Sequence, residues 1–271
     1  MKGACRASTV PTDRLVKKAT EFLQKYEPVR GYFLADSGGK DSSVARELCK
    51  MAEVKYFAGY SNTGIDPPEV VSFIKHNHPE TVLLRPKENF YSLVSRKCPP
   101  LPGRRWCCEE IKERVGIDLK RFYPVHITGV RAEESGKRAR TQKVEITRRM
   151  GVVTIKPIFH WREWHIWDFI EKHKLPYCSL YDEGFERIGC VTCPMIFQPN
   201  QAKLNIHKER WPGKFRAFER AVKKWYDRKQ MVDCPHGSFE KYMEAYYRGF
   251  GKKKRESKEK QTQMFREEFG K

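Results

Sequence analysis

The hydrophobic positions of this chain follow two patterns that alternate along its length. One is a short continuous apolar run bounded by turn residues, which is typical of a strand buried in a sheet. Such runs, some of them interrupted by a single polar residue or bounded by a threonine, occupy residues 32–35, 54–60, 81–84, 125–128 and 152–155. Segments with helical spacing lie between them, and strands that alternate with helices indicate a parallel sheet. We therefore predict an α/β fold, a parallel twisted sheet with helices on both faces.

The second pattern, apolar residues at helical spacing, predicts the helices around this sheet. It appears in residues 12–26, 44–51 and 70–74, and in an aromatic stripe over residues 161–170 that we interpret as core packing. A longer amphipathic segment runs from Leu204 to Tyr226. That segment predicts a helical appendage after the last strand.

The length of the chain, 271 residues, allows one large α/β domain and an appendage. We predict a first domain over residues 1–198, which holds the sheet and most cysteines, and a helical C-terminal segment over residues 199–271. No apolar run reaches the roughly 18 residues that a membrane span needs. The N-terminal residues also lack the apolar stretch of a secretory signal, so we expect a cytoplasmic protein with reduced cysteines.

A turn rich in glycine, serine and charge separates the first predicted strand from the helix after it. Its residues are Ser37, Gly38, Gly39, Lys40, Asp41 and Ser42. Glycines let the backbone approach an anion closely, and the free N–H groups of a helix start attract it. The hydroxyls and the lysine add donors and charge, whereas the aspartate is expected to cap the helix or to hold another side chain. The turn predicts a phosphate-binding loop, with an ordinary strand–turn–helix connection as the alternative.

This loop resembles the SGGxDS loop of the PP-loop superfamily. That superfamily includes ATP pyrophosphatases, thiouridine synthetases and adenosine (phospho)phosphosulfate reductases. The resemblance implies the fold called adenine nucleotide alpha hydrolase-like. By itself it does not choose the reaction.

Two further loops, after the second and fourth predicted strands, resemble segments of the sulfonucleotide reductases. Asn62-Thr63-Gly64 is similar to their DTGxxxPET segment, with asparagine in place of aspartate. Gly129-Val-Arg131 and the residues up to Ser135 are similar to GxRxxES. An arginine at a strand end can fork onto phosphate or sulfate oxygens. The resemblance implies nucleotide or phosphate contacts for Thr63, Gly64 and Arg131, and the nearby Arg138 is expected to add to the anion site. A polar turn and a solvated charged loop are the alternatives.

The chain has nine cysteines, and four of them form a suggestive set: Cys107, Cys108, Cys190 and Cys193. A CxxC pair by itself fits zinc or a redox pair, but adjacent cysteines suit a tetrahedral zinc knuckle poorly because their side chains diverge. A vicinal pair with a distant CxxC resembles the reductases that carry a [4Fe–4S] cluster on four thiolates. The resemblance implies that cofactor here, with zinc and free thiols left open. The family's CCxxRK keeps its lysine, Lys112, but has Ile111 in place of the arginine.

The net charge of the chain indicates a further class of binding partner. The chain carries 54 lysines and arginines against 34 acidic residues, a formal net charge of +20. Such a balance favours polyanionic partners, either a nucleotide or a nucleic acid. Residues 251–260 hold six basic residues against two acidic ones, so a basic tail supplies part of the excess.

The reductases end in a tail with the sequence ECGxH, whose cysteine is the nucleophile. Here Asp233-Cys234-Pro235-His236 resembles it only loosely. This implies Cys234 as the nucleophile, with a plain loop cysteine as the alternative.

The sequence therefore leads to an expected enzyme of sulfate assimilation. It would reduce adenosine 5′-phosphosulfate or its 3′-phospho form to sulfite through a cysteine thiosulfonate, with thioredoxin or glutaredoxin as reductant. One alternative is an ATP-dependent PP-loop sulfurtransferase that thiolates tRNA or DNA, which the basic charge favours. Another is a regulatory protein that senses a nucleotide.

Overall fold

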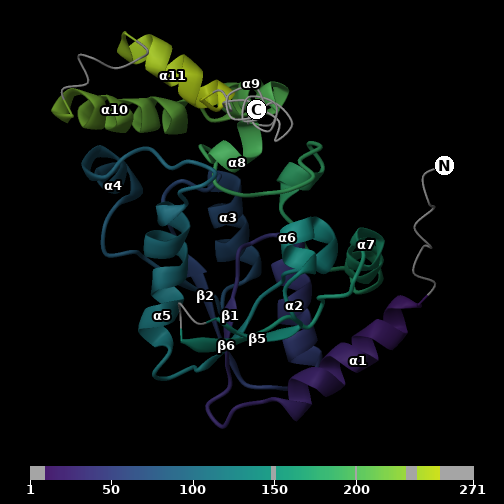
Figure 1. Cartoon of the computed structure of the whole chain (residues 1–271). Coiled ribbons are helices and arrows are strands. Elements are labelled where there is room, and N and C mark those ends of the chain that lie inside the picture. The colour runs from purple at the N-terminus through teal and green to yellow at the C-terminus, as the bar shows by residue number, and fades with distance from the viewer. Residues whose placement is uncertain (1–9, 148–150, 199, 230–236, 251–271) are drawn as a thin grey trace, which may run out of the picture. The chain divides into compact units, whose positions relative to one another are not determined.

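The computed structural model describes residues 10–147, 151–198, 200–229 and 237–250. The chain divides into two compact units (Figure 1). The first consists of Met1–Phe90 and Arg105–Cys190, and the second of Tyr91–Arg104 and Val191–Lys271. Among the described residues, no helix is long and apolar enough to cross a membrane. The domain boundary at residue 198 stays a prediction.

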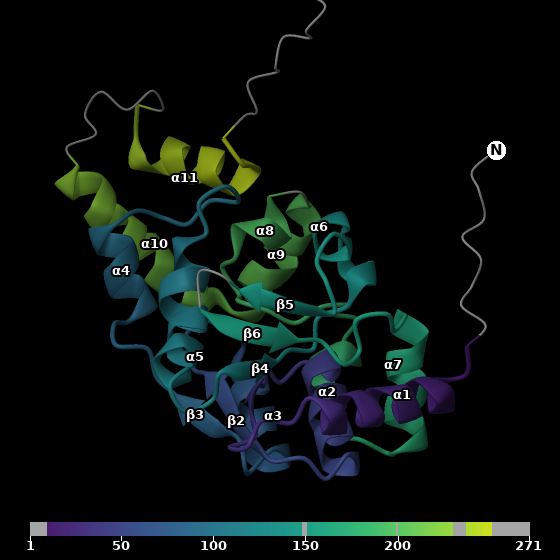
Figure 2. The same cartoon turned by 60° about the horizontal axis from the view of Figure 1, so that its bottom comes forward.

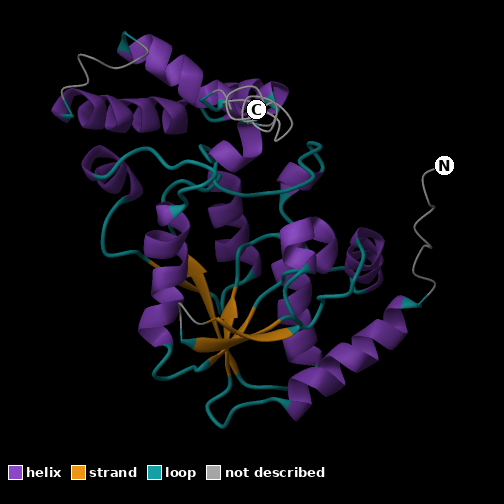
Figure 3. Ribbon diagram, in the orientation of Figure 1, coloured by secondary structure: helices purple, strands orange, loops and turns teal. Residues whose placement is uncertain are grey.

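A six-stranded sheet forms the centre of the first unit, and Figure 3 shows its twist. The strand order is β3-β2-β1-β4-β6-β5. Neighbouring strands are parallel except for β5, which runs antiparallel to β6 along one edge. The bounds are β1 Tyr32–Ala35, β2 Tyr56–Ser61, β3 Val82–Leu84, β4 Val125–Ile127, β5 Val144–Thr147 and β6 Val152–Ile155. The predicted α/β sheet is confirmed, and β5 is the strand that the sequence pattern missed.

Alternate residues of the central strand β1 face opposite sides of the sheet, as the pleat requires. Tyr32 and Leu34 belong to the core cluster that the sheet forms with α1 (Thr12–Lys25), α2 (Lys40–Met51) and α7 (Glu163–Lys172). These three helices lie together in Figure 2. Phe33 points the other way, where its ring lies 4.8 Å from that of His126, and both rings lie close to Gly116 of α5 (Arg114–Leu119). The prediction of helices on both faces is confirmed.

The first unit also contains further helical elements: α3 (Pro68–Asn77), the π-helix η1 (Cys108–Glu113), the 3-10 helices η2 (Ala132–Glu134) and η3 (Ser179–Tyr181), and α6 (Gly136–Ala139). The helix α4 (Phe90–Arg96) belongs to the second unit except for Phe90. The aromatic stripe predicted near α7 is largely core, since Trp161, Ile166, Phe169 and Ile170 are buried.

The strand order reverses next to β1, which places a topological switch point between β1 and β4. From β1 the chain continues to β2 and β3 on one side, then returns to β4 on the other. In sheets of this kind, ligands bind outside the carboxyl ends of the strands at that point. The glycine-rich loop follows β1, and the loop with Arg131 follows β4. The topology thus brings two of the sequence motifs to adjacent strand ends.

The second unit contains α8 (Pro194–Phe197), α9 (Gln201–Arg210), α10 (Pro212–Arg228) and α11 (Phe239–Arg248). Aromatic rings, among them Phe197, Phe215 and Tyr247, pack together in its core. The predicted helical appendage is confirmed, and the amphipathic segment from Leu204 to Tyr226 falls in two helices, α9 and α10. Pro212 starts α10, because proline disfavours a helical residue before it and lacks the N–H that would continue α9.

Candidate active site

The glycine-rich loop takes a tight path from β1 into α2. Gly38 has φ of +67°, which favours glycine, and a Cβ there would come within 2.8 Å of Val70 Cγ1. Gly39 precedes the first turn of α2 as its N-cap and supplies no side-chain cap. The N–H groups of that turn therefore lie at the carboxyl edge of the sheet, where an anion can accept from them.

A buried carboxylate, Asp36, fixes this path from the inside. Its Oδ1 accepts from the Gly38 N–H (2.9 Å) and from the Ser42 hydroxyl (3.2 Å). Its Oδ2 accepts from His78 Nδ1 (2.6 Å) and from the Thr81 hydroxyl (3.0 Å). We call Asp36, Ser42, His78 and Thr81 the inner anchor. It ties the loop after β1 to the connection between α3 and β3.

The inner anchor is a structural support and not a nucleophilic site. Asp36 is 4% exposed and His78 is 0% exposed. The other ring nitrogen of His78 lies 3.4 Å from the hydroxyl of Ser43, which is also buried. Burial opposes ionisation of Asp36, but the hydrogen bond and charge of His78, with the Gly38 and Thr81 hydrogen bonds, outweigh it and lower its pKa. The loop thus rests on a charged group that water does not reach.

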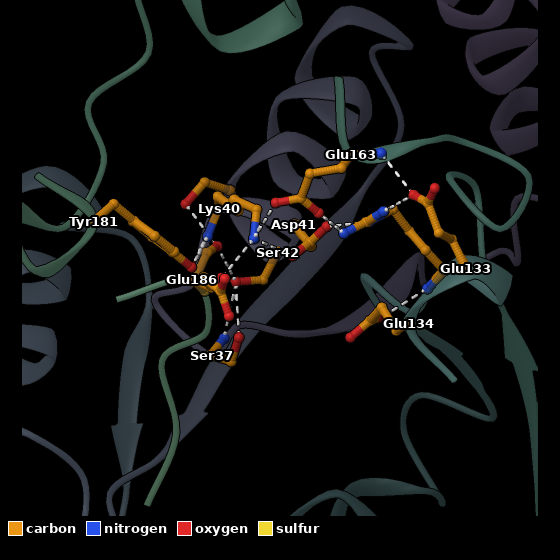
Figure 4. A network of polar contacts seen from close by, with 12 residues as sticks. Ser37, Lys40, Asp41, Ser42, Glu133, Glu134, Glu163, Tyr181 and Glu186 are labelled. Carbon is orange, nitrogen blue, oxygen red and sulfur yellow. Dashed lines mark hydrogen bonds and ion pairs between the residues drawn. The ribbon is translucent and has the colours of Figure 1, made fainter. Parts of the chain in front are cut away.

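A second cluster lies on the outer side of the loop and consists of ion pairs (Figure 4). Lys40 Nζ lies 3.1 Å from Glu163 Oε1 and 3.6 Å from Asp41 Oδ2, and it donates to the Glu186 carbonyl (3.3 Å). Its ammonium also lies 5.0 Å from the centre of the Tyr181 ring. The Lys40 side chain is only 4% exposed, so the positive charge predicted for this loop is present and already paired.

Arg131 completes the outer cluster with contacts to three carboxylates. Its Nε donates to Asp41 Oδ1 (2.5 Å), its Nη1 to Glu133 Oε2 (2.9 Å), and its Nη2 to Glu163 Oε2. Burial opposes the charge of Arg131, but Asp41 and Glu163 raise its pKa. We call Lys40, Asp41, Arg131, Glu133 and Glu163 the outer ion network. Of the two roles predicted for Asp41, it holds a side chain, that of Arg131, and does not cap α2.

Glu163 occupies a particular position in this network because it contacts both cations. One carboxylate oxygen binds Lys40 and the other binds Arg131. Burial would raise its pKa, but Lys40 and then Arg131 lower it. Its side chain is 49% exposed, against 3–4% for the two cations. A half-exposed carboxylate therefore lies where the two cations converge.

Tyr181 contacts the start of α2 from a distant part of the chain. Its hydroxyl accepts from the Lys40 N–H (3.0 Å) and lies 3.4 Å from the position of a Cβ on Gly39. Burial raises the pKa of this hydroxyl, so it stays protonated at neutral pH.

The loop after β2 holds a separate buried network. Thr63 Oγ1 and the Tyr60 hydroxyl both donate to Asp66 Oδ2, at 2.9 and 2.8 Å, and Lys112 Nζ donates to Asp66 Oδ1 at 3.1 Å. Burial opposes the charge of Asp66, but Lys112 lowers its pKa. The Thr63 side chain is thus bound within the turn. Gly64, with φ of +76°, has open space where a Cβ would lie.

Lys112 also connects this network to the cysteines. Burial opposes its charge, but Asp66 and Cys190, which accepts a hydrogen bond from it, raise its pKa. A hydrogen bond with Cys107 is the main cause that lowers the pKa of Cys108. Burial opposes this shift, and Arg105 and Lys112 add to it. Arg105 Nη2 lies 3.3 Å from Cys108 Sγ. Three of the four cysteines therefore share one cationic neighbourhood.

This donor set has the chemistry that an iron–sulfur cluster needs, namely cysteine thiols outside disulfides beside positive charge that favours the thiolate form. Cys193, the fourth, begins α8 as its N-cap in the second unit. Within the residues described, no three or more histidine, cysteine or acidic side chains stand together as a metal site. The cluster stays a prediction.

The last two predicted site residues lie outside these networks. Arg138 of α6 pairs with Glu134 of η2, and its side chain is 30% exposed. Cys234 lies outside the described residues.

Sequence reasoning missed several residues of the site: Asp36, His78, Glu163, Tyr181 and Glu186. Asp36 directly precedes the predicted loop, so an acidic residue at a strand end was an available signal. His78 lies 42 residues from its contact Asp36. Glu163 and Tyr181 lie 123 and 141 residues from their shared contact Lys40. No local pattern marks such distant partners.

Comparison with known proteins connects this geometry to a family. The family model described as the phosphoadenosine phosphosulfate reductase domain matches residues 31–196, which include the glycine-rich loop, the loop after β4 and all four cysteines. The chain belongs to this family. The resemblance seen in its motifs is therefore confirmed at the level of the family.

Its relatives include both uncharacterized proteins and reductases. An uncharacterized protein of Methanocaldococcus jannaschii is 29% identical over 238 residues, covering 82% of this chain and 48% of its own. The adenosine 5′-phosphosulfate reductase of Shouchella clausii is 34% identical over 107 residues, covering 40% of this chain and 43% of its own. The chain spans about half the length of the curated relatives it matches.

A solved structure supports the fold. Candida glabrata FMN adenylyltransferase, in complex with FAD and inorganic pyrophosphate, superposes with a TM-score of 0.52 at 14% identity, covering 70% of this chain and 67% of that one. At this identity the likeness concerns the fold alone.

Proposed function

We propose that the protein reduces an adenylated sulfate, adenosine 5′-phosphosulfate or its 3′-phospho form, to sulfite. The observation that carries this proposal is the glycine-rich loop at the switch point, with Lys40 and Arg131 converging beside it, in a chain of the reductase family. The N–H groups at the start of α2 would bind the phosphosulfate group. The adenine ring and the ribose of the nucleotide would lie farther along the carboxyl edge of the sheet.

The outer ion network would take part in binding by exchanging one anion for another. Glu163 binds both cations and is half-exposed, so it is the carboxylate that an incoming phosphosulfate would replace. Asp41 and Glu133 would continue to orient the Arg131 guanidinium. The fork of Arg131 suits the tetrahedral oxygens of sulfate or phosphate.

The chemical step would be a thiolate attack on sulfur. A cysteine thiolate, Cys234 in this proposal, forms a bond to the sulfur of the sulfate while the bond from that sulfur to the bridging oxygen breaks. Adenosine monophosphate, or its 3′-phospho form, leaves with the electron pair. A dithiol such as thioredoxin or glutaredoxin then attacks the thiosulfonate, releases sulfite and becomes oxidised to a disulfide. Two electrons from the dithiol thus reduce the sulfate to sulfite.

Cys107, Cys108, Cys190 and Cys193 would hold a [4Fe–4S] cluster in this proposal. When bound, such a cluster would supply electrostatic tuning beside the nucleotide. Iron content after anaerobic purification tests this assignment. Cys108→Ser should lose the iron, whereas Cys178→Ser, which changes a buried cysteine outside the set, should retain it. Equal iron content in both variants would contradict the assignment.

The reaction itself is tested by sulfite release. Both sulfonucleotides are supplied anaerobically with thioredoxin to the wild type and to Cys234→Ser. Sulfite from the wild type and none from the variant would support the reductase and its nucleophile. Sulfite from both would move the nucleophile to another cysteine, and no sulfite from an iron-loaded wild type would refute the reductase.

A second candidate is an ATP-dependent sulfurtransferase that thiolates a nucleic acid. The net charge of +20 favours it, and so does the loose match around Cys234 to the reductase tail. Such an enzyme cleaves ATP between its α- and β-phosphates. Release of pyrophosphate from ATP that depends on added RNA or DNA would support this candidate over the reductase.

A further inference from the structure

The second unit carries a row of positive charge on its longest helix. Arg216, Arg220, Lys224 and Arg228 are spaced four residues apart along α10, and all four are exposed. We call these four residues the basic stripe. With a rise of 1.5 Å per residue, the stripe is about 18 Å long.

These charges are not neutralised within the helix. Among the residues that the structure describes, Arg216, Arg220 and Lys224 have no carboxylate partner. Arg228 donates to the carbonyl oxygen of Arg96, which leaves its charge intact.

The two carboxylates of α10 bind other groups. Glu219 accepts from the Tyr247 hydroxyl (2.7 Å) and lies 3.7 Å from Lys208 Nζ. Asp227 pairs with Lys223 at 2.6 Å. Like charges at i and i+4 destabilise a helix, so the stripe opposes the stability of the element that bears it. An arrangement of this kind is stabilised by a bound polyanion.

We propose that the basic stripe of α10 binds the phosphate backbone of double-stranded RNA. Long, exposed and unpaired arginine and lysine side chains are the groups that bind phosphates. The basic stripe belongs to the second unit, and none of the four stripe residues takes part in the reaction proposed above. The inference therefore does not depend on the proposed reductase activity.

The surroundings of the stripe argue for a duplex rather than a single strand. Proteins bind single strands by stacking bases on exposed aromatic rings. The Phe215, Phe218 and Tyr226 rings of α10 are buried, and Trp225 is partly buried against Tyr242. The stripe thus presents charge without a stacking surface.

The packing of α10 also argues for RNA rather than for sequence reading in DNA. A helix that reads DNA inserts into the major groove, about 12 Å wide, and touches base edges there. One side of α10 is packed in the core of its unit, so only the stripe side is available to a partner. An RNA duplex is recognised largely through its phosphates and 2′-hydroxyls, without entry of side chains into its deep major groove.

The test compares two variants that lose the same charge. The stripe variant is Arg216→Gln, Arg220→Gln and Lys224→Gln. The control is Arg14→Gln, Lys18→Gln and Lys25→Gln, which changes three exposed basic residues of α1 in the first unit. Both are made in the full chain, and binding to a labelled RNA duplex is measured by fluorescence anisotropy over a range of salt concentrations. Thermal unfolding of each variant is measured in parallel.

We expect the stripe variant to bind the RNA duplex at least tenfold more weakly than the wild type at moderate salt. Its plot of log Kd against log salt should be shallower by about 2–3, because each phosphate contact contributes roughly 0.7–0.9 to the slope. The control should keep a slope close to that of the wild type. The stripe variant should also unfold at an equal or higher temperature, because like-charge repulsion within α10 is relieved.

Three outcomes would overturn the proposal. If both variants lose affinity equally, net charge and not the stripe binds RNA. If a DNA duplex of the same length binds the wild type as tightly as RNA does, and loses as much affinity in the stripe variant, the assignment to RNA is wrong. If the wild type does not bind the RNA duplex, the surface has no such partner.

Discussion

The inner anchor and the outer ion network hold the same loop from opposite sides, but they differ in their exposure to solvent. Asp36 and His78 are almost completely buried, and every contact of Asp36 is a hydrogen bond from a fixed donor. In the outer network the two cations are buried, but the Glu163 carboxylate that joins them is 49% exposed.

This difference indicates a division of roles. A buried, fully bonded carboxylate is costly to disturb, so the inner anchor fixes the backbone of the loop. An exposed carboxylate exchanges its partners with water or a ligand at low cost. The outer network is therefore the side on which an anion can enter.

The largest effect is expected at the inner anchor. Asp36→Ala removes the acceptor for Gly38, Ser42, His78 and Thr81 in a site without water, and should lower the free energy of unfolding by about 3–5 kcal/mol. Urea denaturation measures this. Asp36→Asn, which keeps one oxygen acceptor, is the matched control and should cost roughly 1–3 kcal/mol. Equal and small losses in both variants would show that the anchor does not hold the loop.

A smaller loss is expected at the outer network. Arg131→Gln removes the guanidinium from three carboxylates, those of Asp41, Glu133 and Glu163. Water reaches all three, and Lys40 still lies beside Asp41 and Glu163, so the free energy of unfolding should fall by only roughly 1–3 kcal/mol. Arg131→Lys keeps the charge but cannot fork across three carboxylates. It should recover part of the stability and little of the nucleotide affinity. Full recovery of affinity by lysine would mean that only charge matters at this position.

The pH dependence of stability distinguishes the two sides further. The pKa values of Asp36 and Glu163 are both lowered in the folded protein. Their stabilisation is therefore complete above the unfolded pKa values, about 3.9 for aspartate and 4.3 for glutamate, and is lost as pH falls through the lower folded values. Unfolding free energy should fall below about pH 4. The fall should be shallower in Asp36→Asn, and an unchanged slope in that variant would contradict the role given to Asp36.

The smallest effect on stability is expected at Arg138. Its pair with Glu134 joins two short helices and is partly exposed, so Arg138→Gln should change the free energy of unfolding by less than about 0.5 kcal/mol. If Arg138 contacts the nucleotide as the sequence predicts, this variant should nevertheless bind it more weakly. Calorimetric titration with the nucleotide measures that difference. Unchanged affinity would remove Arg138 from the site.

The sequence predicted the parts of this architecture that local patterns encode. The strands from β1 to β4 and β6 are short and mainly apolar runs. The loop at Ser37–Ser42 is recognisable in the sequence from its glycines and serines. The edge strand β5 was missed because its pattern is inverted: Val144 and Ile146 are exposed, while Glu145 and Thr147 face partly inward. Pro212 could have predicted the break between α9 and α10. The aromatic residues keep a helical spacing across this position, so their pattern gave no sign of the break.

The partners of the loop were harder to predict for a physical reason. Sequence patterns report which residues share a strand or a helix face, whereas His78 reaches Asp36 and Glu163 reaches Lys40 only after the sheet has formed. Arg131 was expected to face an anionic ligand, and the structure shows that it already faces three carboxylates. Residue type gave the chemistry of the site, and tertiary structure decided which charges are already paired.

The most direct test of this account is the affinity for adenosine 5′-phosphosulfate, measured by calorimetry on the wild type, Glu163→Gln and Asp36→Asn. The account predicts that Glu163→Gln binds more tightly than the wild type, because the internal competitor for Lys40 and Arg131 is gone. It predicts that Asp36→Asn, still folded by circular dichroism, binds about tenfold more weakly, a loss of about 1.4 kcal/mol. If the wild type does not bind, or if Glu163→Gln binds as weakly as Asp36→Asn, the division between an inner anchor and an exchangeable outer network is wrong.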